Sequence, residues 1–119
     1  MKTELKINGI YSYSFEDEEN AYIIILKKEN RNSYYLYVLD CLNECSNNEI
    51  QERLINDISN NIIKLSFFIE VDSTTICNTI DGYIGQCSDE ICDKLLKFYE
   101  TKRFGLLKIL KRRKFKFIP

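Results

Sequence analysis

Apolar and polar side chains follow a strand-like pattern through the first third of the chain. In residues 7–15, aromatic side chains alternate with smaller ones, which is typical of a strand with two different faces. Residues 21–26 are apolar throughout, as in a strand that is covered on both faces. A polar connection at residues 27–33 leads to a third strand at residues 34–39. These segments predict an antiparallel meander.

Two helices are predicted from their start signals and from the spacing of their apolar residues. Ser46 and Glu49 have the spacing of a capping box, and apolar residues follow at helical intervals as far as residue 58. Ser88 is a good N-cap for an amphipathic helix over residues 89–100, whose first turn carries an aspartate and a glutamate.

Between these helices the chain is predicted to return to the sheet. Residues 65–71 and residues 74–80 are short apolar or β-branched runs, so both are predicted to be strands. Asp81-Gly82 and Gly85 are predicted to be turn positions, because glycine adopts positive φ at little cost. Helices that follow runs of strands predict an α+β fold, or a small antiparallel barrel with helices packed on it.

The length and the cysteines narrow the class of protein. A chain of 119 residues suits one domain with its own core. No apolar run reaches the roughly 18 residues of a transmembrane helix and the first residues are charged, so we expect a cytoplasmic protein without a membrane span or signal peptide. The five cysteines are odd in number and scattered. Their C-x3-C and C-x4-C spacings could supply a four-thiolate zinc site, but zinc favours tighter pairs near C-x2-C, so neither a metal site nor another cofactor is expected. Cys77 and Cys92 are predicted to be buried apolar residues.

Charge divides the chain into two parts. Residues 1–101 hold nine Lys/Arg and eighteen Asp/Glu, whereas residues 102–119 hold eight Lys/Arg and no acid. We therefore expect a domain with a closing helix at residues 1–101 and a basic extension at residues 102–119.

The basic extension has the composition of a nucleic-acid-binding segment. Its cations can bind phosphates, and the aromatic rings between them can stack on unpaired bases. The predicted nucleic-acid-binding residues are Lys108, Lys111, Arg112, Arg113, Lys114, Phe115 and Lys116. An anionic membrane, an acidic protein or the chain's own acidic body are alternative partners of this extension.

An acidic loop follows the first predicted strand and has two interpretations. It consists of Glu16, Asp17, Glu18 and Glu19. Such a run is usually a solvated loop. It could also mimic the phosphates of a nucleic acid and thereby bind a basic cleft on a partner protein.

Two stretches of the chain resemble the MazF/PemK family of toxin ribonucleases. Asn8-Gly9-Ile10-Tyr11 is similar to the family's opening strand, and Ile84-Gly85-Gln86-Cys87-Ser88-Asp89-Glu90 is similar to the run that enters its last helix. With the segments beside them, the resemblance covers about two-thirds of the chain. It implies a small SH3-like β-barrel with two or three packed helices, a homodimer, and RNA or an antitoxin protein as the partner.

The chain departs from that family at the positions that act on RNA. Asn20 and Ala21 stand where the family has an arginine and a proline, and residues 39–42 stand where it has a threonine. Cleavage through the 2′-hydroxyl needs a base, an acid and a cation near the phosphate, and this chain has no histidine. Lys28 and Arg31 remain as candidate catalytic cations.

Three functions therefore stay open. The preferred hypothesis is a degenerate, non-catalytic MazF/PemK-like barrel that binds RNA or a protein partner. The first alternative is an active, sequence-specific endoribonuclease toxin of a toxin–antitoxin system with a rearranged site. The second alternative is a small inhibitor or regulator that acts through its acidic face.

Overall fold

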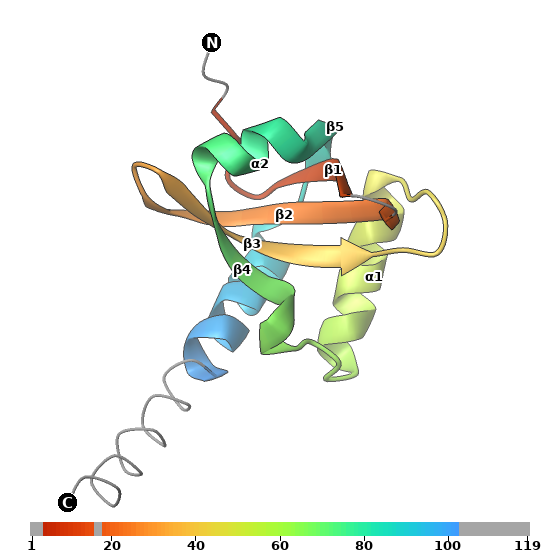
Figure 1. Cartoon of the computed structure of the whole chain (residues 1–119). Coiled ribbons are helices and arrows are strands. Elements are labelled where there is room, and N and C mark those ends of the chain that lie inside the picture. Colours follow the sequence, from red (N-terminus) through yellow and green to blue (C-terminus); the bar gives the residue numbers. More distant parts are fainter. Residues whose placement is uncertain (1–3, 16–17, 103–119) are drawn as a thin grey trace, which may run out of the picture.

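The chain folds into one antiparallel sheet with helices on both of its faces. The computed structural model describes residues 4–15 and 18–102, with side chains left out at residues 14–19. In this part of the chain, five strands and three α-helices form an α+β fold, which confirms the predicted class (Figure 1). Within the same residues, no helix has the length and apolar character needed to span a bilayer.

The strands follow one another as a meander, and the last strand returns to the first. They are β1 (Gly9–Phe15), β2 (Glu18–Asn30), β3 (Ser33–Asp40), β4 (Phe68–Asp72) and β5 (Ile80–Gln86). Their order in the sheet is β4-β3-β2-β1-β5, and every neighbouring pair is antiparallel. The predicted meander of the first three strands is therefore confirmed, and β4 and β5 are the two edges of the sheet.

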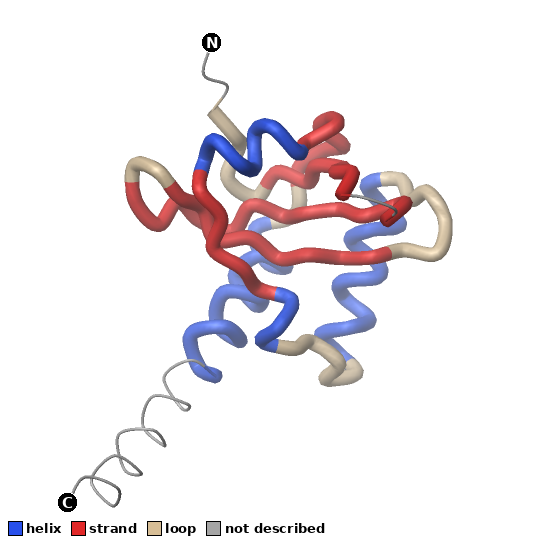
Figure 2. The backbone as a smooth tube through the Cα atoms, in the orientation of Figure 1, coloured by secondary structure: helices blue, strands red, loops and turns tan. Residues whose placement is uncertain are grey.

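Helices α1 (Asn47–Ser59) and α2 (Ser73–Thr79) and a C-terminal helix over residues 89–102 cover the sheet. Figure 2 shows α1 and the C-terminal helix together on one side and α2 on the other. A short 3-10 helix at Leu65–Phe67 precedes β4, so the predicted strand over residues 65–71 is shorter than expected.

Each face of the sheet has its own apolar core. The helix-side core comprises Ile10, Tyr22, Ile24, Leu26, Tyr37, Leu39, Ile50, Leu54, Ile63, Phe68, Cys87, Ile91, Cys92 and Leu95. The α2-side core comprises Leu5, Tyr11, Ile23, Ile25, Tyr34, Leu36 and Ile76. Successive residues of β2 alternate between the two cores. The prediction that residues 21–26 form a strand covered on both faces is therefore confirmed.

Both predicted capping signals are present at the helix starts. The Ser46 hydroxyl accepts from the Glu49 N–H at 3.3 Å, and the Glu49 carboxylate accepts from the Ser46 N–H at 3.1 Å. These two bonds complete the capping box of α1. The Ser88 hydroxyl likewise accepts from the Ile91 N–H at 3.3 Å and caps the C-terminal helix. Cys92 lies on the buried side of that helix, as predicted.

The prediction of a strand over residues 74–80 is wrong. This segment is mostly helix α2, which begins after the N-cap Asp72. The Asp72 carboxylate accepts from the Thr75 N–H at 3.1 Å and from its hydroxyl at 2.6 Å. These capping bonds outweigh the strand propensity of threonine and isoleucine, which depends strongly on context. Ile76 is the buried residue of α2, and Cys77 is exposed rather than buried.

The turn predicted at residues 81–85 is also wrong, because those residues lie in strand β5. None of the described glycines has a positive φ. Strand β2 is longer than predicted at both ends. It continues to Asn30, so the connection to β3 is a turn of two residues. It begins at Glu18, so part of the predicted acidic loop belongs to the strand.

Candidate functional site

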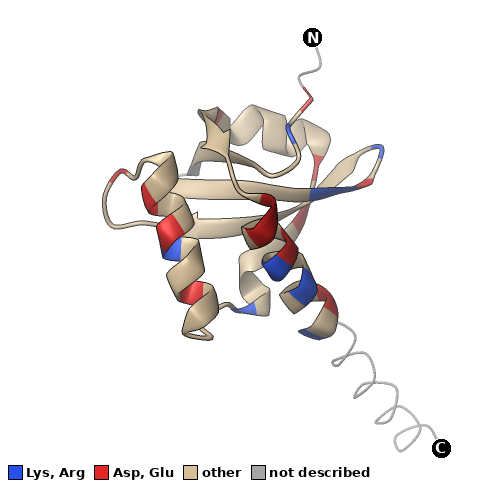
Figure 3. Cartoon of the chain, turned by 180° about the vertical axis from the view of Figure 1, so that it is seen from behind, with Lys and Arg blue, Asp and Glu red and all other residues tan. Residues whose placement is uncertain are grey.

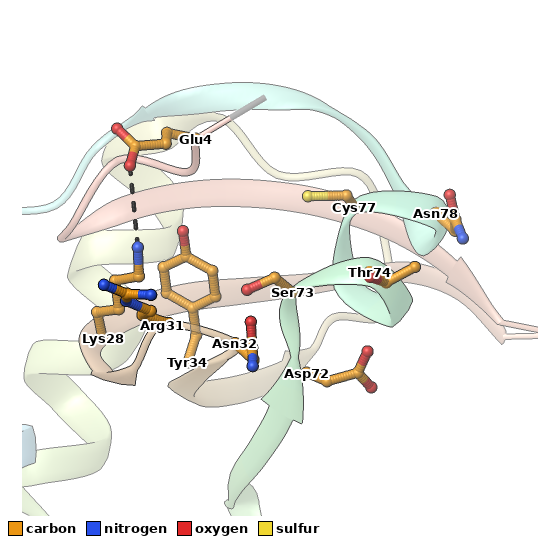
Figure 4. A pocket seen from close by; sticks show the side chains of 10 residues that line it. All are labelled: Glu4, Lys28, Arg31, Asn32, Tyr34, Asp72, Ser73, Thr74, Cys77 and Asn78. Carbon is orange, nitrogen blue, oxygen red and sulfur yellow. Dashed lines mark ion pairs between the residues drawn. The ribbon is translucent and has the colours of Figure 1, made fainter. Parts of the chain in front are cut away.

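An open pocket of about 970 Å³ lies between the β2–β3 hairpin and helix α2 (Figure 4). Its walls come from three parts of the chain that are distant in sequence: the N-terminal segment, the hairpin, and the junction of β4 with α2. Both candidate catalytic cations, Lys28 and Arg31, line this pocket. We call it the hairpin pocket.

The cations of the hairpin pocket have few competing partners. The Lys28 ammonium lies 3.8 Å from a carboxylate oxygen of Glu4 and 5.9 Å from the centre of the Tyr34 ring. Glu4 is 86% exposed at its side chain, so this ion pair is solvated and weak. Arg31 is exposed in the hairpin turn. Two cations are thus available to a ligand that enters the pocket.

Hydroxyl groups complete the polar lining. Figure 4 shows the hydroxyls of Tyr34 and Ser73 directed toward the space between the hairpin and α2.

The two walls of the pocket are joined by a hydrogen bond from the Ser73 N–H of α2 to the Asn32 carbonyl oxygen of the hairpin, at 2.6 Å. Asn32 is itself fixed by a bond from its N–H to the Asn30 side chain at 2.7 Å. Backbone bonds therefore hold the two walls together.

Asp72 lines the same pocket, but its carboxylate already has partners. It accepts from the hydroxyl and the N–H of Thr75, and these bonds lower the pKa of Asp72 below its ordinary value. A carboxylate that caps a helix is a poor proton acceptor for a substrate. The pocket is therefore suited to binding an anion rather than to acid–base chemistry.

The positions at which the MazF/PemK resemblance places RNA cleavage meet at the opposite end of the sheet. Ala21 pairs with Asp40 across β2 and β3, and the Cys41 N–H donates to the Asn20 carbonyl oxygen at 3.1 Å. The Asn20 side chain donates to the Leu42 carbonyl oxygen at 3.3 Å. Among residues 20–21 and 39–42, Asp40 is the single charged residue. This corner therefore brings the two segments together but offers no cation from them.

The hairpin cations do not reach this corner. Arg31 lies ten positions after Ala21 and Lys28 seven positions after it, which is roughly 33 Å and 23 Å of extended chain. Figure 1 shows the hairpin at one end of the sheet and the loop that leads to α1 at the other. Lys28 and Arg31 therefore cannot replace the missing arginine there.

The other predicted site residues lie largely outside the described residues. Lys108, Lys111, Arg112, Arg113, Lys114, Phe115 and Lys116 all belong to residues 103–119, and Glu16 and Asp17 form the gap before β2. Glu18 and Glu19 begin β2, with their side chains left out. The predictions for the basic extension and for the acidic loop therefore stay predictions.

Charge on the described surface is mainly negative. Residues 4–15 and 18–102 contain sixteen Asp/Glu and nine Lys/Arg. Acidic residues gather on α1 and the C-terminal helix, on the side of the sheet opposite α2 (Figure 3). In the same part of the chain, no three His, Cys, Asp or Glu residues are grouped so that they could hold a metal ion.

Sequence reasoning missed the residues that α2 brings to the hairpin pocket. The sequence predicts a break between two strands at Ser73 and the start of a strand at Thr74, so it does not predict that a helix brings both to the hairpin. The signal was present in Asp72-Ser73-Thr74-Thr75, since an aspartate three residues before a threonine N–H is an N-cap pattern.

The fold and the hairpin pocket define a small α+β protein with a polar site that carries two cations. No protein-family model matches the chain, and neither a curated protein nor a solved structure matches it. Function is therefore inferred from the residues of the chain and their arrangement.

Proposed function

We propose that this chain binds single-stranded RNA in the hairpin pocket without cleaving it. The observation that carries the proposal is that Lys28 and Arg31 share one pocket, whereas acidic residues outnumber basic ones over residues 4–15 and 18–102. Lysine and arginine bind phosphate oxygens through charge-assisted hydrogen bonds, and arginine can do so with two bonds at once.

The remaining lining of the pocket fits a nucleotide backbone. The hydroxyls of Tyr34, Ser73 and Thr74 can donate to phosphate or accept from a ribose 2′-hydroxyl. The Tyr34 ring is only 4% exposed, so base stacking is not its role. We infer that the pocket contacts the sugar–phosphate backbone, and that unpaired bases stay outside it.

Binding without cleavage follows from the state of the carboxylates. The Asp72 carboxylate already caps α2, and the exposed Glu4 carboxylate lies 3.8 Å from the Lys28 ammonium, which a bound phosphate would occupy instead. The corner at Asn20 and Ala21 supplies no cation of its own. An active endoribonuclease would need a base, an acid and a cation at one phosphate.

The test is incubation of the full chain with mixed-sequence single-stranded RNA, read by gel shift and by cleavage at two salt concentrations. The variant Lys28→Ala/Arg31→Ala should lose the shift. Lys94→Ala/Lys97→Ala on the C-terminal helix is the matched control, because it removes the same charge on the opposite side of the sheet, and it should keep the shift. Glu4→Gln should bind more tightly, because it removes the carboxylate that competes for Lys28.

Three other outcomes of this experiment would contradict the proposal, and each would indicate a different function or binding site. RNA cleavage would support the endoribonuclease alternative. A shift that survives in Lys28→Ala/Arg31→Ala but disappears when residues 108–119 are deleted would assign binding to the basic extension. If no variant binds RNA, the proposal is wrong, and a protein partner of the acidic face becomes the hypothesis to test.

We also propose that the sheet closes into an SH3-like β-barrel. Support comes from the α2-side core, which takes buried side chains from β1, β2 and β3 and packs against Val71 of β4 and Ile80 of β5. The seven residues of α2 connect these two edge strands directly. Nuclear Overhauser contacts between the backbones of β4 and β5 would demonstrate closure. If no such contacts are found, the sheet is open.

A further inference from the structure

Two cysteines stand at the ends of the loop between β3 and α1. Both are free thiols of intermediate exposure, and both pack against the helix-side core. The Cys45 thiol donates to the Asn43 carbonyl oxygen at 3.3 Å. Burial, and after it the neighbouring Cys45 thiol, raises the pKa of Cys41, so the two thiols lie close together.

Strand β2 holds both ends of this loop. The Cys41 N–H donates to the Asn20 carbonyl oxygen at 3.1 Å, and the Cys45 N–H donates to the Tyr22 hydroxyl at 2.8 Å. Tyr22 is only 2% exposed and cannot move freely. Between the anchors the loop faces solvent, since Leu42 is 96% exposed. The thiols are thus held together where a small oxidant can reach them.

A second thiol pair gives an internal comparison. Interaction between the Cys87 and Cys92 thiols lowers the pKa of Cys87 and raises that of Cys92. Both residues are only 1% exposed and lie in the helix-side core. Two thiols are thus neighbours in both pairs, but only the loop pair is partly exposed. Because thiol oxidation follows exposure as well as ionisation, the loop pair is the more accessible target.

We propose that Cys41 and Cys45 form a modification site at which a peroxide converts the two thiols into one reversible disulfide. Burial, followed by the neighbouring Cys45 thiol, raises the pKa of Cys41 to about 11. Cys41 therefore keeps its proton at neutral pH, and Cys45 is the sulfur that attacks the peroxide.

The reaction balances with one peroxide for each disulfide. The Cys45 sulfur attacks one peroxide oxygen, the O–O bond breaks, and the departing oxygen leaves as water after protonation when the oxidant is hydrogen peroxide. Cys45 is then a sulfenic acid. The Cys41 sulfur attacks the Cys45 sulfur, the S–O bond breaks, and the Cys41 proton leaves with the hydroxyl as a second water. The two thiols lose two electrons, and the peroxide gains them.

The experiment treats the reduced, folded full chain with hydrogen peroxide, blocks the remaining thiols by alkylation, and maps the peptides by mass spectrometry. The expected product is a Cys41–Cys45 bridge, with a mass lower by the two lost hydrogens, and a dithiol reductant should restore the starting mass. Cys41→Ser and Cys45→Ser should each abolish the bridge. Cys77→Ser, which removes an exposed thiol outside both pairs, should leave it unchanged. Circular dichroism confirms that each variant is folded.

Two comparisons decide the result. In the folded chain, the Cys41–Cys45 bridge should form at least about tenfold faster than a Cys87–Cys92 bridge. In a glutathione buffer, its equilibrium constant should be at least about tenfold larger in the folded chain than in urea, or about 30 mV in reduction potential. The proposal is overturned if Cys87 and Cys92 couple first, if Cys45 is oxidised further without a bridge, or if folding leaves the equilibrium constant unchanged.

Discussion

At Gly85, β5 passes close to the start of α1. A Cβ atom there would lie 2.5 Å from the side-chain nitrogen of Asn47 and 2.9 Å from its Cγ. At Gly82, three residues earlier along β5, the nearest atom would be the Ser12 hydroxyl oxygen at 3.9 Å. The two glycines thus have different roles, although both were predicted to be turn residues.

Gly85→Ala should therefore destabilise the protein by about 1–2 kcal/mol, because Asn47 must give way. Gly82→Ala should be neutral or slightly stabilising, since alanine loses less backbone entropy on folding than glycine does. Urea unfolding of both variants checks this. Asn47→Ala should reduce the cost of Gly85→Ala in a double-mutant cycle. Equal effects of the two glycine substitutions would show that no close contact with α1 exists.

The ion pair between Arg53 and Asp57 differs from others on the described surface because its carboxylate is buried. The Arg53 Nε lies 3.3 Å from Asp57, whose side chain is 8% exposed. The Glu90–Lys94 pair has the same spacing along a helix and the same distance of 3.3 Å, but the Glu90 side chain is 79% exposed. Burial and the nearby Asp57 carboxylate also raise the pKa of Tyr37.

Arg53→Met, which keeps the aliphatic stem, should cost about 1–2 kcal/mol, because it leaves a buried carboxylate without its cation. That value lies below the usual cost for a fully buried pair, since Arg53 itself is 46% exposed. Lys94→Met is the matched control and should cost less than about 0.5 kcal/mol. Chemical denaturation of both variants measures the difference. Similar losses would mean that burial of Asp57 does not strengthen the pair.

At the scale of elements, capping signals predicted helix starts better than apolar runs predicted strands. Ser46 with Glu49, and Ser88 ahead of its acidic turn, placed two helices correctly because each signal depends on neighbouring residues alone. The run at residues 74–80 was misplaced, because short β-branched runs suit either element and tertiary contacts decide between them. Its own N-cap, Asp72, was the more reliable signal.

The two acidic caps should make folding stability depend on pH. The pKa of Glu49 is lowered by its bond from the Ser46 backbone, and that of Asp72 by its bonds from Thr75. A carboxyl group with a lowered folded pKa adds stability that is complete above its unfolded pKa and is lost as the pH falls through its folded pKa. The ordinary values are 4.5 and 3.8, so stability should fall as the pH is lowered below about 4.5.

Glu49→Gln and Asp72→Asn keep a hydrogen-bond acceptor but cannot ionise. Both variants should therefore show a flatter decline in unfolding free energy between about pH 5 and pH 3 than the parent chain does. Urea titrations at fixed pH values measure the slope. A slope that is unchanged in both variants would place the acid sensitivity in other carboxyl groups.

At the scale of the whole molecule, the hairpin pocket could be predicted only in part. Lys28 and Arg31 are candidates from the sequence because cleavage of RNA needs a cation near the phosphate, but no spacing distinguishes them from other cations such as Lys27. Their neighbours Ser73 and Thr74 lie more than forty residues away in sequence, and they reach the hairpin because β4 pairs with β3, with Asp72 opposite Ser33. Local sequence patterns carry no information about that pairing. The meander was predictable because its strands are consecutive in sequence. The pairing of β5 with β1 was not predictable, because these two strands are far apart in sequence.

The salt dependence of RNA affinity reports how many phosphates the pocket neutralises. For a single strand, the logarithm of affinity falls with the logarithm of salt concentration with a slope of about 0.7 for each contacted phosphate. If Lys28 and Arg31 each contact one phosphate, Lys28→Ala/Arg31→Ala should reduce the slope by about 1.4, and any residual binding should be less sensitive to salt. The matched variant Lys94→Ala/Lys97→Ala should keep the parental slope, because it changes net charge equally without touching the pocket. A reduction shared by both variants would mean that RNA responds to overall charge, and the two hairpin cations would then have no specific contact with the phosphates.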